Sequence, residues 1–166
     1  MLQKKVCMVG VFGTGKTCLV QRYVHSIFSE KYLGTVGVKI DRKEVQASGQ
    51  PVTLMLWDLE GRDGHRDIST SYLRGAHGII YVVDGTRRET FDQIFEIRDI
   101  VRGEIGDVPS VLALNKTDLV DAWRLDAAAE KSAEAESWHL LRTSAKTGQG
   151  VESAFLWLAD ATVGAT

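Results

Sequence analysis

The sequence contains few of the residues and segments that define several common protein classes. Its 166 residues include only two cysteines and two prolines. A membrane-spanning helix needs about 18 or more consecutive apolar residues, and the sequence has no such run. Cys7 and Cys18 lack the spacing of metal ligands, so we expect both to be buried packing residues in a reducing compartment. The scarcity of cysteine therefore argues against a disulfide-held domain or a zinc site.

Targeting and lipidation signals are also missing. Lys4 and Lys5 precede an apolar run, but Gly10 interrupts this run too early for a signal peptide. Leu2 stands where N-myristoylation requires glycine, and no cysteine for prenylation lies near the C-terminus. We therefore expect a cytoplasmic protein with no direct lipid anchor, which meets membranes only through its partners.

An excess of charge of one sign is absent as well. The chain has 20 Lys and Arg residues against 22 Asp and Glu, a formal net charge of −2. A nucleic-acid binder needs a basic patch or stripe, so we expect no nucleic-acid partner. With 44% hydrophobic residues, a chain of this length can bury a sizeable core. We predict one domain over residues 1–166; the sequence leaves the oligomeric state open, with a monomer favoured.

Residues 10–17, GVFGTGKT, form a complete G-x-x-x-x-G-K-[ST] phosphate loop between an apolar run and an amphipathic one. Its glycines permit backbone angles that are closed to other residues, so that consecutive N–H groups can point at the α- and β-phosphates. Lys16 supplies a positive charge for the β- and γ-phosphates, and Thr17 offers a hydroxyl to Mg²⁺. The loop predicts a nucleoside triphosphate site. Its expected nucleotide contacts are Gly13, Thr14, Gly15, Lys16, Thr17 and Cys18.

Short apolar strands alternate with amphipathic helices along the chain. The predicted strands are Val6–Val9, Val38–Ile40, Val52–Trp57, His77–Asp84, Val111–Leu114 and His139–Leu141. The predicted helices are Lys16–His25, Thr86–Gly103, Asp121–Ser137 and Val151–Leu158. The overall predicted order is β-α-β-β-α-β-α-β-α-β-α, which includes one further helix between the strands at 52–57 and 77–84. This order predicts an α/β fold: a doubly wound, six-stranded, mostly parallel sheet with one antiparallel strand and a ligand site at its carboxyl edge.

The segment Asn115–Asp118, NKTD, follows the strand at 111–114 and predicts the base. The Asp118 carboxylate can accept hydrogen bonds from N1–H and the 2-amino group of guanine, which adenine does not offer. A buried carboxylate left unpaired rejects the wrong base by roughly 10⁴-fold or more. We expect Lys116 to lie over the base, Asn115 to tie this segment to the phosphate loop, and Ser144, Ala145 and Lys146 to present backbone N–H to guanine O6. GTP or GDP, with Mg²⁺, is therefore the predicted cofactor.

Five segments occur in the order that guanine-nucleotide proteins require. They are residues 10–17, Thr35, Trp57-Asp58 with Gly61, residues 115–118 and residues 144–146. In these motifs the chain resembles the Ras-like small GTPases over nearly its whole length. Residues 71–80, SYLRGAHGII, are most similar to the Rab-type branch, and GTRRET after Asp84 is similar to Rab-like GTPases of bacteria. The resemblance implies a P-loop NTPase of the Ras-like G domain type.

The resemblance also assigns roles. It implies that Thr35 binds Mg²⁺ and the γ-phosphate, that Asp58 holds the metal through water, and that Phe28 packs against guanine, while Tyr32 covers the phosphates. Thr17, Thr35 and Asp58 are, independently, the hard oxygen ligands that Mg²⁺ prefers. The implied catalytic residues are Lys16, Thr35 and Gly61, with Arg62 in question. Effectors and regulators are expected at loops 28–40 and 58–74.

Three residues beside the expected γ-phosphate depart from the family pattern. Arg62 replaces a glutamine that orients the attacking water, and a guanidinium offers no acceptor for a water proton. Hydrolysis is therefore predicted to be slow and partner-dependent; an internal arginine finger at Arg62 is the rival hypothesis. Glu60 can repel the phosphate, help to place the metal, or turn outward to Arg66. Phe12 either obstructs an activating protein's arginine or packs over the loops.

The leading hypothesis for function is a GTP/GDP switch with slow GTPase activity, acting in signalling, trafficking or polarity through nucleotide-dependent effector binding. Ile40, Trp57 and Tyr72 are a candidate apolar contact surface, although Trp57 fits the core equally well. The alternative is a hydrolysis-deficient guanine-nucleotide-binding module that acts as a constitutive interaction protein. A P-loop kinase for a small metabolite is disfavoured, because no acceptor-site or lid segment is seen and Asp118 selects guanine.

Overall fold

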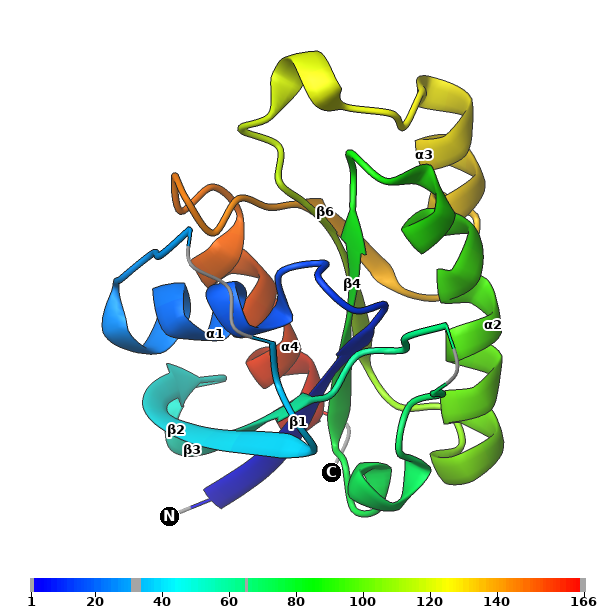
Figure 1. The fold of residues 1–166 in the computed structure, drawn as a ribbon. Helices are drawn as coiled ribbons and strands as arrows, with labels where there is room; N and C mark the ends of the chain where they lie inside the picture. The colour runs from blue at the N-terminus through cyan, green and yellow to red at the C-terminus, as the bar shows by residue number, and fades with distance from the viewer. Residues whose placement is uncertain (1, 31–33, 65, 165–166) are drawn as a thin grey trace.

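A six-stranded sheet with helices on both faces organises the computed structural model, which describes residues 2–30, 34–64 and 66–164 (Figure 1). The strands are β1 (Leu2–Gly10), β2 (Val38–Ala47), β3 (Gln50–Leu59), β4 (Gly78–Asp84), β5 (Ser110–Asn115) and β6 (His139–Arg142). The helices are α1 (Lys16–His25), α2 (Arg88–Ile105), α3 (Ala127–Glu134) and α4 (Val151–Gly164), and two short 3₁₀ helices are η1 (Thr70–Leu73) and η2 (Val120–Ala122).

The strand order is β2-β3-β1-β4-β5-β6, and β2 pairs with β3 as an antiparallel hairpin while the other neighbours are parallel. This arrangement confirms the predicted doubly wound sheet with one antiparallel strand. The parallel order brings the carboxyl ends of β1, β3, β4 and β5 to one edge, where open α/β sheets bind ligands. Asp84 pairs with Asn115 in register at that edge.

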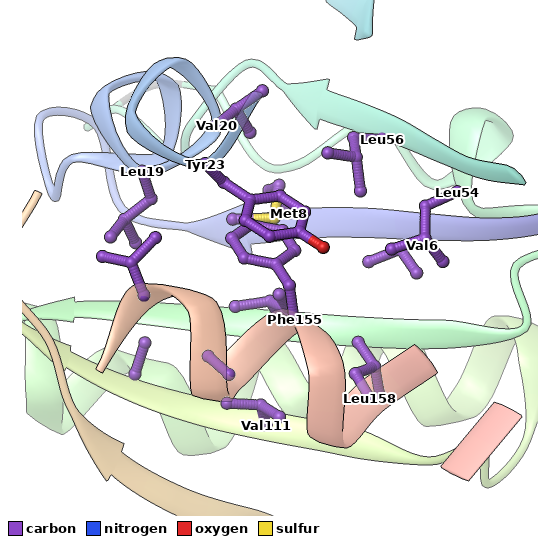
Figure 2. Packing of buried hydrophobic residues seen from close by; sticks show 14 of the residues in the cluster. Val6, Met8, Leu19, Val20, Tyr23, Leu54, Leu56, Val111, Phe155 and Leu158 are labelled. Atoms are coloured by element: carbon purple, nitrogen blue, oxygen red, sulfur yellow. The ribbon is translucent and has the colours of Figure 1, made fainter. Parts of the chain in front are cut away.

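The sheet is buried on both sides because its strands alternate apolar residues between two cores. Val6 and Met8 of β1 belong to the core under α1 and α4, whereas Cys7 and Val9 belong to the core under α2 and α3. In the first core, Tyr23 of α1 stacks on Phe155 of α4 with ring centroids 4.1 Å apart (Figure 2). The helix that follows the phosphate loop is thereby held firmly against the sheet.

Two predicted helices were wrong in part. In the described residues between β3 and β4, the helical structure is the short η1, because the apolar residues Ile68 and Leu73 bury singly rather than in a helical stripe. The helix predicted at 121–137 is divided into η2 and α3. Asp126 sets the start of α3 by accepting a 2.8 Å hydrogen bond from the backbone N–H of Ala129, which is the geometry of a helix N-cap.

None of the helices in the described part of the chain combines the length and the apolar character that crossing a bilayer demands.

Candidate nucleotide-binding site

The phosphate loop joins the end of β1 to the start of α1. Gly13 and Gly15 have φ values of 77° and 101°, in the left-handed region that favours glycine, and Gly15 is the residue before the first turn of α1. The side chain of Lys16 curls back over the loop, and its Nζ donates to the carbonyl of Val11 at 3.0 Å. The loop and the N-terminus of α1 thus form the anion cradle that the motif predicts.

Lys16 is 3% exposed, and burial lowers the pKa of its ammonium group from 10.5 to about 8. The negative charge of Asp58 acts in the opposite direction, and the positive charge of Arg87 lowers the pKa further. A buried cation of this kind is stabilised by an anion, because the anion replaces the hydration that burial removed. The site is therefore electrostatically suited to phosphate groups.

The three predicted magnesium ligands lie together although they come from three segments. Thr17 Oγ1 lies 2.6 Å from Thr35 Oγ1 and donates to Asp58 Oδ2 at 2.6 Å. The other carboxylate oxygen, Asp58 Oδ1, is buried and has no hydrogen-bond partner among the described residues. Burial also raises the pKa of this carboxyl, so a nearby cation would stabilise its charged form. Two hydroxyls and a carboxylate fit Mg²⁺, which completes its shell with phosphate and water oxygens.

The expected guanine site is a cavity of about 250 Å³ beside the phosphate loop. It is lined by Gly13, Gly15, Cys18, Phe28, Ser29, Glu30, Asn115, Lys116, Asp118, Leu119, Ala145 and Lys146. Ser144 is not among the lining residues, but its Oγ donates to Oδ1 of the lining residue Asp118 at 2.7 Å. This contact fixes the carboxylate that we expect to select guanine.

Asn115 joins the base segment to the phosphate loop, as predicted. Its Nδ2 donates to the carbonyl of Thr14 at 3.0 Å, and its Oδ1 accepts a hydrogen bond from Thr143 Oγ1 at 3.0 Å. Both amide atoms of Asn115 are therefore satisfied inside the protein. The hydrogen bond from Asn115 to Thr14 therefore connects the predicted base site to the phosphate loop.

The guanidinium of Arg62 is held by two carboxylates. The Arg62 side chain is 14% exposed, and its guanidinium forms ion pairs with Asp67 at 3.0 Å and with Glu96 of α2 at 3.2 Å. The hydrogen bonds from Arg62 hold the pKa of the Asp67 carboxyl below its usual value. The backbone of Arg62, in contrast, meets the phosphate loop: its N–H donates to Gly10 at 3.0 Å and its carbonyl accepts from Phe12 at 2.8 Å.

The other two departures are also placed by the structure. Glu60 turns outward, as one of the three alternatives proposed: its Oε1 pairs with Arg66 Nη1 at 3.4 Å, and its Oε2 accepts from the N–H of Gly37 at 3.3 Å. Phe12 is 41% exposed, and its ring lies over Gly34, where an added Cβ would sit 3.2 Å from Phe12 Cε2. This contact favours the interpretation that Phe12 packs over the loops.

Gly61 is a close approach point between the loops. A Cβ at this position would lie 2.6 Å from the backbone nitrogen of Phe12 and 2.8 Å from Lys16 Nζ, so only glycine fits.

The candidate apolar contact surface is only partly exposed. Trp57 is half-buried: its ring packs against Tyr72, and Lys5 Nζ lies 3.6 Å from the ring centroid. Ile40 is exposed. The prediction for Tyr32 falls outside the described residues.

Sequence reasoning missed the turn after β4 as part of the site. Asp84 Oδ2 pairs with Lys116 Nζ at 2.9 Å, and Lys116 also donates to the carbonyl of Gly13 at 3.1 Å. Arg87 donates to the carbonyl of Phe12 at 2.9 Å. The available signal was a strand that ends in a carboxylate at the ligand edge of the sheet.

The fold and the phosphate loop are those of a P-loop protein, with a cavity at the predicted base site and an oxygen cluster at the predicted metal site. The family model described as "Ras family" matches residues 5–163, and the chain belongs to this family. Three relatives are similar over most of their length. "Ras-related protein Rab-1" of Theileria annulata is 38% identical over 160 residues, covering 95% of this chain and 73% of the relative. "GTP-binding protein ypt1" of Schizosaccharomyces pombe is 36% identical over 154 residues, 92% and 76% of the two chains. "Ras-related protein Rab-1A" of Dictyostelium discoideum is 36% identical over 157 residues, 93% and 78%.

These matches confirm the Rab-like resemblance. The protein is a Ras-family GTPase that binds GTP and GDP with Mg²⁺, hydrolyses GTP, and interacts with effectors and regulators. The hydrolysis-deficient alternative is not favoured. The similarity to bacterial members stays a prediction.

Proposed function

We propose that the protein acts as a trafficking-type switch in which loops 28–40 and 58–74 report the bound nucleotide to effectors. The observation that carries this proposal is the cluster of Thr17, Thr35 and Asp58, in which one oxygen from each loop and one from α1 lie within hydrogen-bonding distance. The γ-phosphate and its Mg²⁺ hold such a cluster in the triphosphate state, and hydrolysis releases it. The names of the Rab-1 and ypt1 relatives support a role of the Rab type.

Different residues of the site bind the phosphates, the base and the metal ion. The backbone N–H groups of residues 13–17 and the ammonium of Lys16 bind the phosphates, and Asp118 with Asn115 orients the base. Thr17, Thr35 and Asp58 would hold Mg²⁺, which neutralises charge on the β- and γ-phosphates when it is bound. Gly61 lets loop 58–74 approach the phosphate loop closely enough to sense the γ-phosphate.

The proposal also covers domain organisation, oligomeric state and location. We infer a single GTPase domain over residues 1–166 that acts as a monomer in the cytoplasm. Of the two cysteines that were expected to be buried, Cys7 is buried, whereas Cys18 is half-buried and lines the base cavity. The low cysteine content suits a reducing compartment. The exposed Ile40 and half-buried Trp57 border the two loops and are candidates for effector contact.

Replacing Thr35 with alanine tests the switch. In the parental protein we expect slower hydrogen exchange in residues 34–40 with a non-hydrolysable GTP analogue than with GDP, because the triphosphate orders this loop through Thr35. Thr35→Ala should abolish most of this difference while stoichiometric nucleotide binding persists. Ser153→Ala, an exposed change on α4, should leave the difference intact. Equal exchange in both nucleotide states of the parental protein would contradict the proposal.

Hydrolysis is tested at Arg62. Because its guanidinium is engaged by Asp67 and Glu96, Arg62→Ala should leave the single-turnover rate within about twofold of the parental rate, at or below the ~10⁻⁴ s⁻¹ scale of unassisted small GTPases. Arg62→Gln should accelerate hydrolysis, since a glutamine can both donate to and accept from the attacking water. A parental half-life of minutes, or clear slowing in Arg62→Ala, would instead favour an internal arginine finger at this position.

A further inference from the structure

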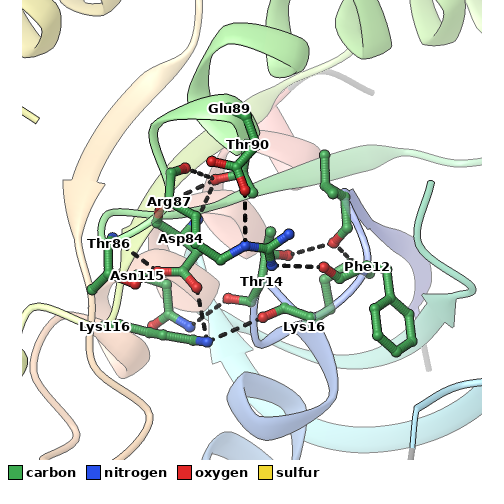
Figure 3. Close-up of polar contacts among 12 residues, drawn as sticks. Phe12, Thr14, Lys16, Asp84, Thr86, Arg87, Glu89, Thr90, Asn115 and Lys116 are labelled. Carbon is green, nitrogen blue, oxygen red and sulfur yellow. Dashed lines mark hydrogen bonds and ion pairs between the residues drawn. The ribbon is translucent and has the colours of Figure 1, made fainter. Parts of the chain in front are cut away.

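Arg87 reaches the phosphate loop from the turn between β4 and α2. Its Nη1 donates to the carbonyl of Phe12 at 2.9 Å, and a Cβ added to Gly13 would lie 3.2 Å from the same nitrogen. On its other side, Arg87 Nε pairs with Glu89 Oε1 at 3.1 Å (Figure 3). The side chain is 38% exposed, so the guanidinium is held between a carboxylate anchor and the loop backbone without being deeply buried.

Lys116 makes the corresponding contact one residue further along the loop. Its Nζ donates to the carbonyl of Gly13 at 3.1 Å and pairs with Asp84 at 2.9 Å (Figure 3). Two consecutive carbonyls of the phosphate loop are therefore bound by two cations, and each cation is anchored on a carboxylate of the same turn region. Asp84 is itself fixed, because its Oδ1 accepts from Thr86 N–H at 2.9 Å and from Thr86 Oγ1 at 2.7 Å.

The direction of the two carbonyls decides the direction of the neighbouring amides. In a planar trans peptide, the C=O of one residue and the N–H of the next point to opposite sides. A Phe12 carbonyl that faces Arg87 therefore turns the N–H of Gly13 to the opposite side, and a Gly13 carbonyl that faces Lys116 does the same for the N–H of Thr14. Inward-directed N–H groups in this loop are the donors that bind phosphate oxygens.

Arg87 also places a positive charge beside the phosphate loop, in addition to that of Lys16. Its Nη1 donates to the carbonyl of Phe12 at 2.9 Å, and a Cβ added to Gly13 would lie 3.2 Å from the same nitrogen. A second positive charge beside the cradle attracts a triphosphate more strongly than a diphosphate, because the triphosphate carries more negative charge. Arg62, whose guanidinium is engaged by Asp67 and Glu96, does not supply this charge to the loop.

We propose that Arg87 is a positioning residue for the nucleotide: it fixes the Phe12–Gly13 peptide with its N–H directed at the phosphates, and it adds a charge that favours the triphosphate. This inference rests on the proposed guanine-nucleotide switch and deepens it. Arg87 thus contacts the phosphate loop through its guanidinium, whereas Arg62 contacts the loop through its main chain.

Dissociation of fluorescent GDP and of a fluorescent non-hydrolysable GTP analogue tests the proposal. A charge-assisted hydrogen bond at a partly exposed site contributes modestly, so Arg87→Ala should release GDP about fivefold to tenfold faster than the parental protein. The GTP analogue should be released faster still, so that the preference for triphosphate falls. Arg88→Ala is the matched control, because this neighbouring arginine pairs with Asp92 on α2 at 3.2 Å; both its rates should stay within about twofold of the parental rates.

Conservative variants separate positioning from a general loss of structure. Arg87→Lys retains the charge and should restore much of the triphosphate preference, whereas Arg87→Gln retains an N–H donor without charge and should restore only the slower release of GDP. Unchanged dissociation rates in Arg87→Ala would overturn the proposal. So would an equal acceleration for both nucleotides that Arg87→Lys does not reverse, because a structural defect alone predicts that result.

Failure of the proposed function gives a different pattern. If the parental protein does not bind guanine nucleotide stoichiometrically, the switch itself fails and so does the inference that rests on it. If the parental protein binds GDP and the GTP analogue while Arg87→Ala and Arg88→Ala behave alike, only the inference about Arg87 fails. Thermal unfolding of each GDP-loaded variant verifies that the compared proteins are folded.

Discussion

Asp118→Ala is expected to lose stoichiometric guanine-nucleotide binding, with an affinity for GDP lower by on the order of a hundredfold to a ten-thousandfold. The carboxylate can make two charge-assisted hydrogen bonds to guanine, each of which contributes about 1.5–3 kcal/mol. Ser144 holds the carboxylate at 2.7 Å, so these bonds need little rearrangement. The preference for GTP over ATP should fall in parallel, because alanine offers no carboxylate that adenine would leave without hydrogen bonds.

The fold should survive this substitution. Ser144 loses one acceptor, but its Oγ still accepts a hydrogen bond from the N–H of Thr147 at 3.1 Å. Asp121→Ala on η2 is a suitable control, since it removes an exposed carboxylate a few residues further along the chain. Nucleotide titration and thermal unfolding of both variants are the measurements. Guanine selectivity in Asp118→Ala equal to that of the control would show that another group reads the base.

Lys16→Met should have two opposite effects. Nucleotide affinity should fall by on the order of a hundredfold or more, because the phosphates lose a buried ammonium group and its charge-assisted hydrogen bonds. The protein stripped of nucleotide, however, should unfold at the same or a higher temperature than the stripped parental protein. Burial disfavours the Lys16 charge, and methionine fills similar space without charge.

The local contacts support the second effect. The carbonyl of Val11, which accepts from Lys16 Nζ, also accepts from Thr14 Oγ1 at 3.0 Å and so keeps a partner in the variant. Lys131→Met, at an exposed position on α3, should alter neither quantity. A clear drop in the melting temperature of the stripped Lys16→Met protein would contradict this prediction, because it would show that the ammonium group stabilises the nucleotide-free protein.

Residues whose identity is required by chemistry were predictable from the sequence. The phosphate loop needs glycine where φ is positive, and Gly13 and Gly15 have such values. Asn115 was expected to tie the base segment to the phosphate loop, and its amide bonds Thr14 and Thr143 in the structure. The roles of Thr35 and Asp58 as partners of Thr17 were implied by the resemblance to Ras-like GTPases, and their oxygen atoms agree with the ligand preference of Mg²⁺.

Features that depend on tertiary packing were not predictable. Three orientations were open for Glu60, and only the folded chain shows it facing Arg66 and Gly37. Arg87 contacts the backbone carbonyl of Phe12. Every residue has such a carbonyl, so the identity of residue 12 gives no sign of this contact. The helix predicted at 121–137 was wrong at its start because Asp126 can cap a helix wherever its side chain reaches the N–H three residues later.

The hydrogen bonds between Arg62 and the phosphate loop are made entirely by the main chain, from Arg62 N–H to Gly10 and from Phe12 N–H to Arg62. A main-chain link is indifferent to the side chains that flank it, as long as none is a proline that removes the donor. The link between the two loops is therefore compatible with phenylalanine at position 12 and arginine at position 62, because neither side chain takes part in it. The main chain of Arg62 thus connects the two loops while its side chain pairs with Asp67 and Glu96, so a substitution at this position can change hydrolysis without breaking the connection.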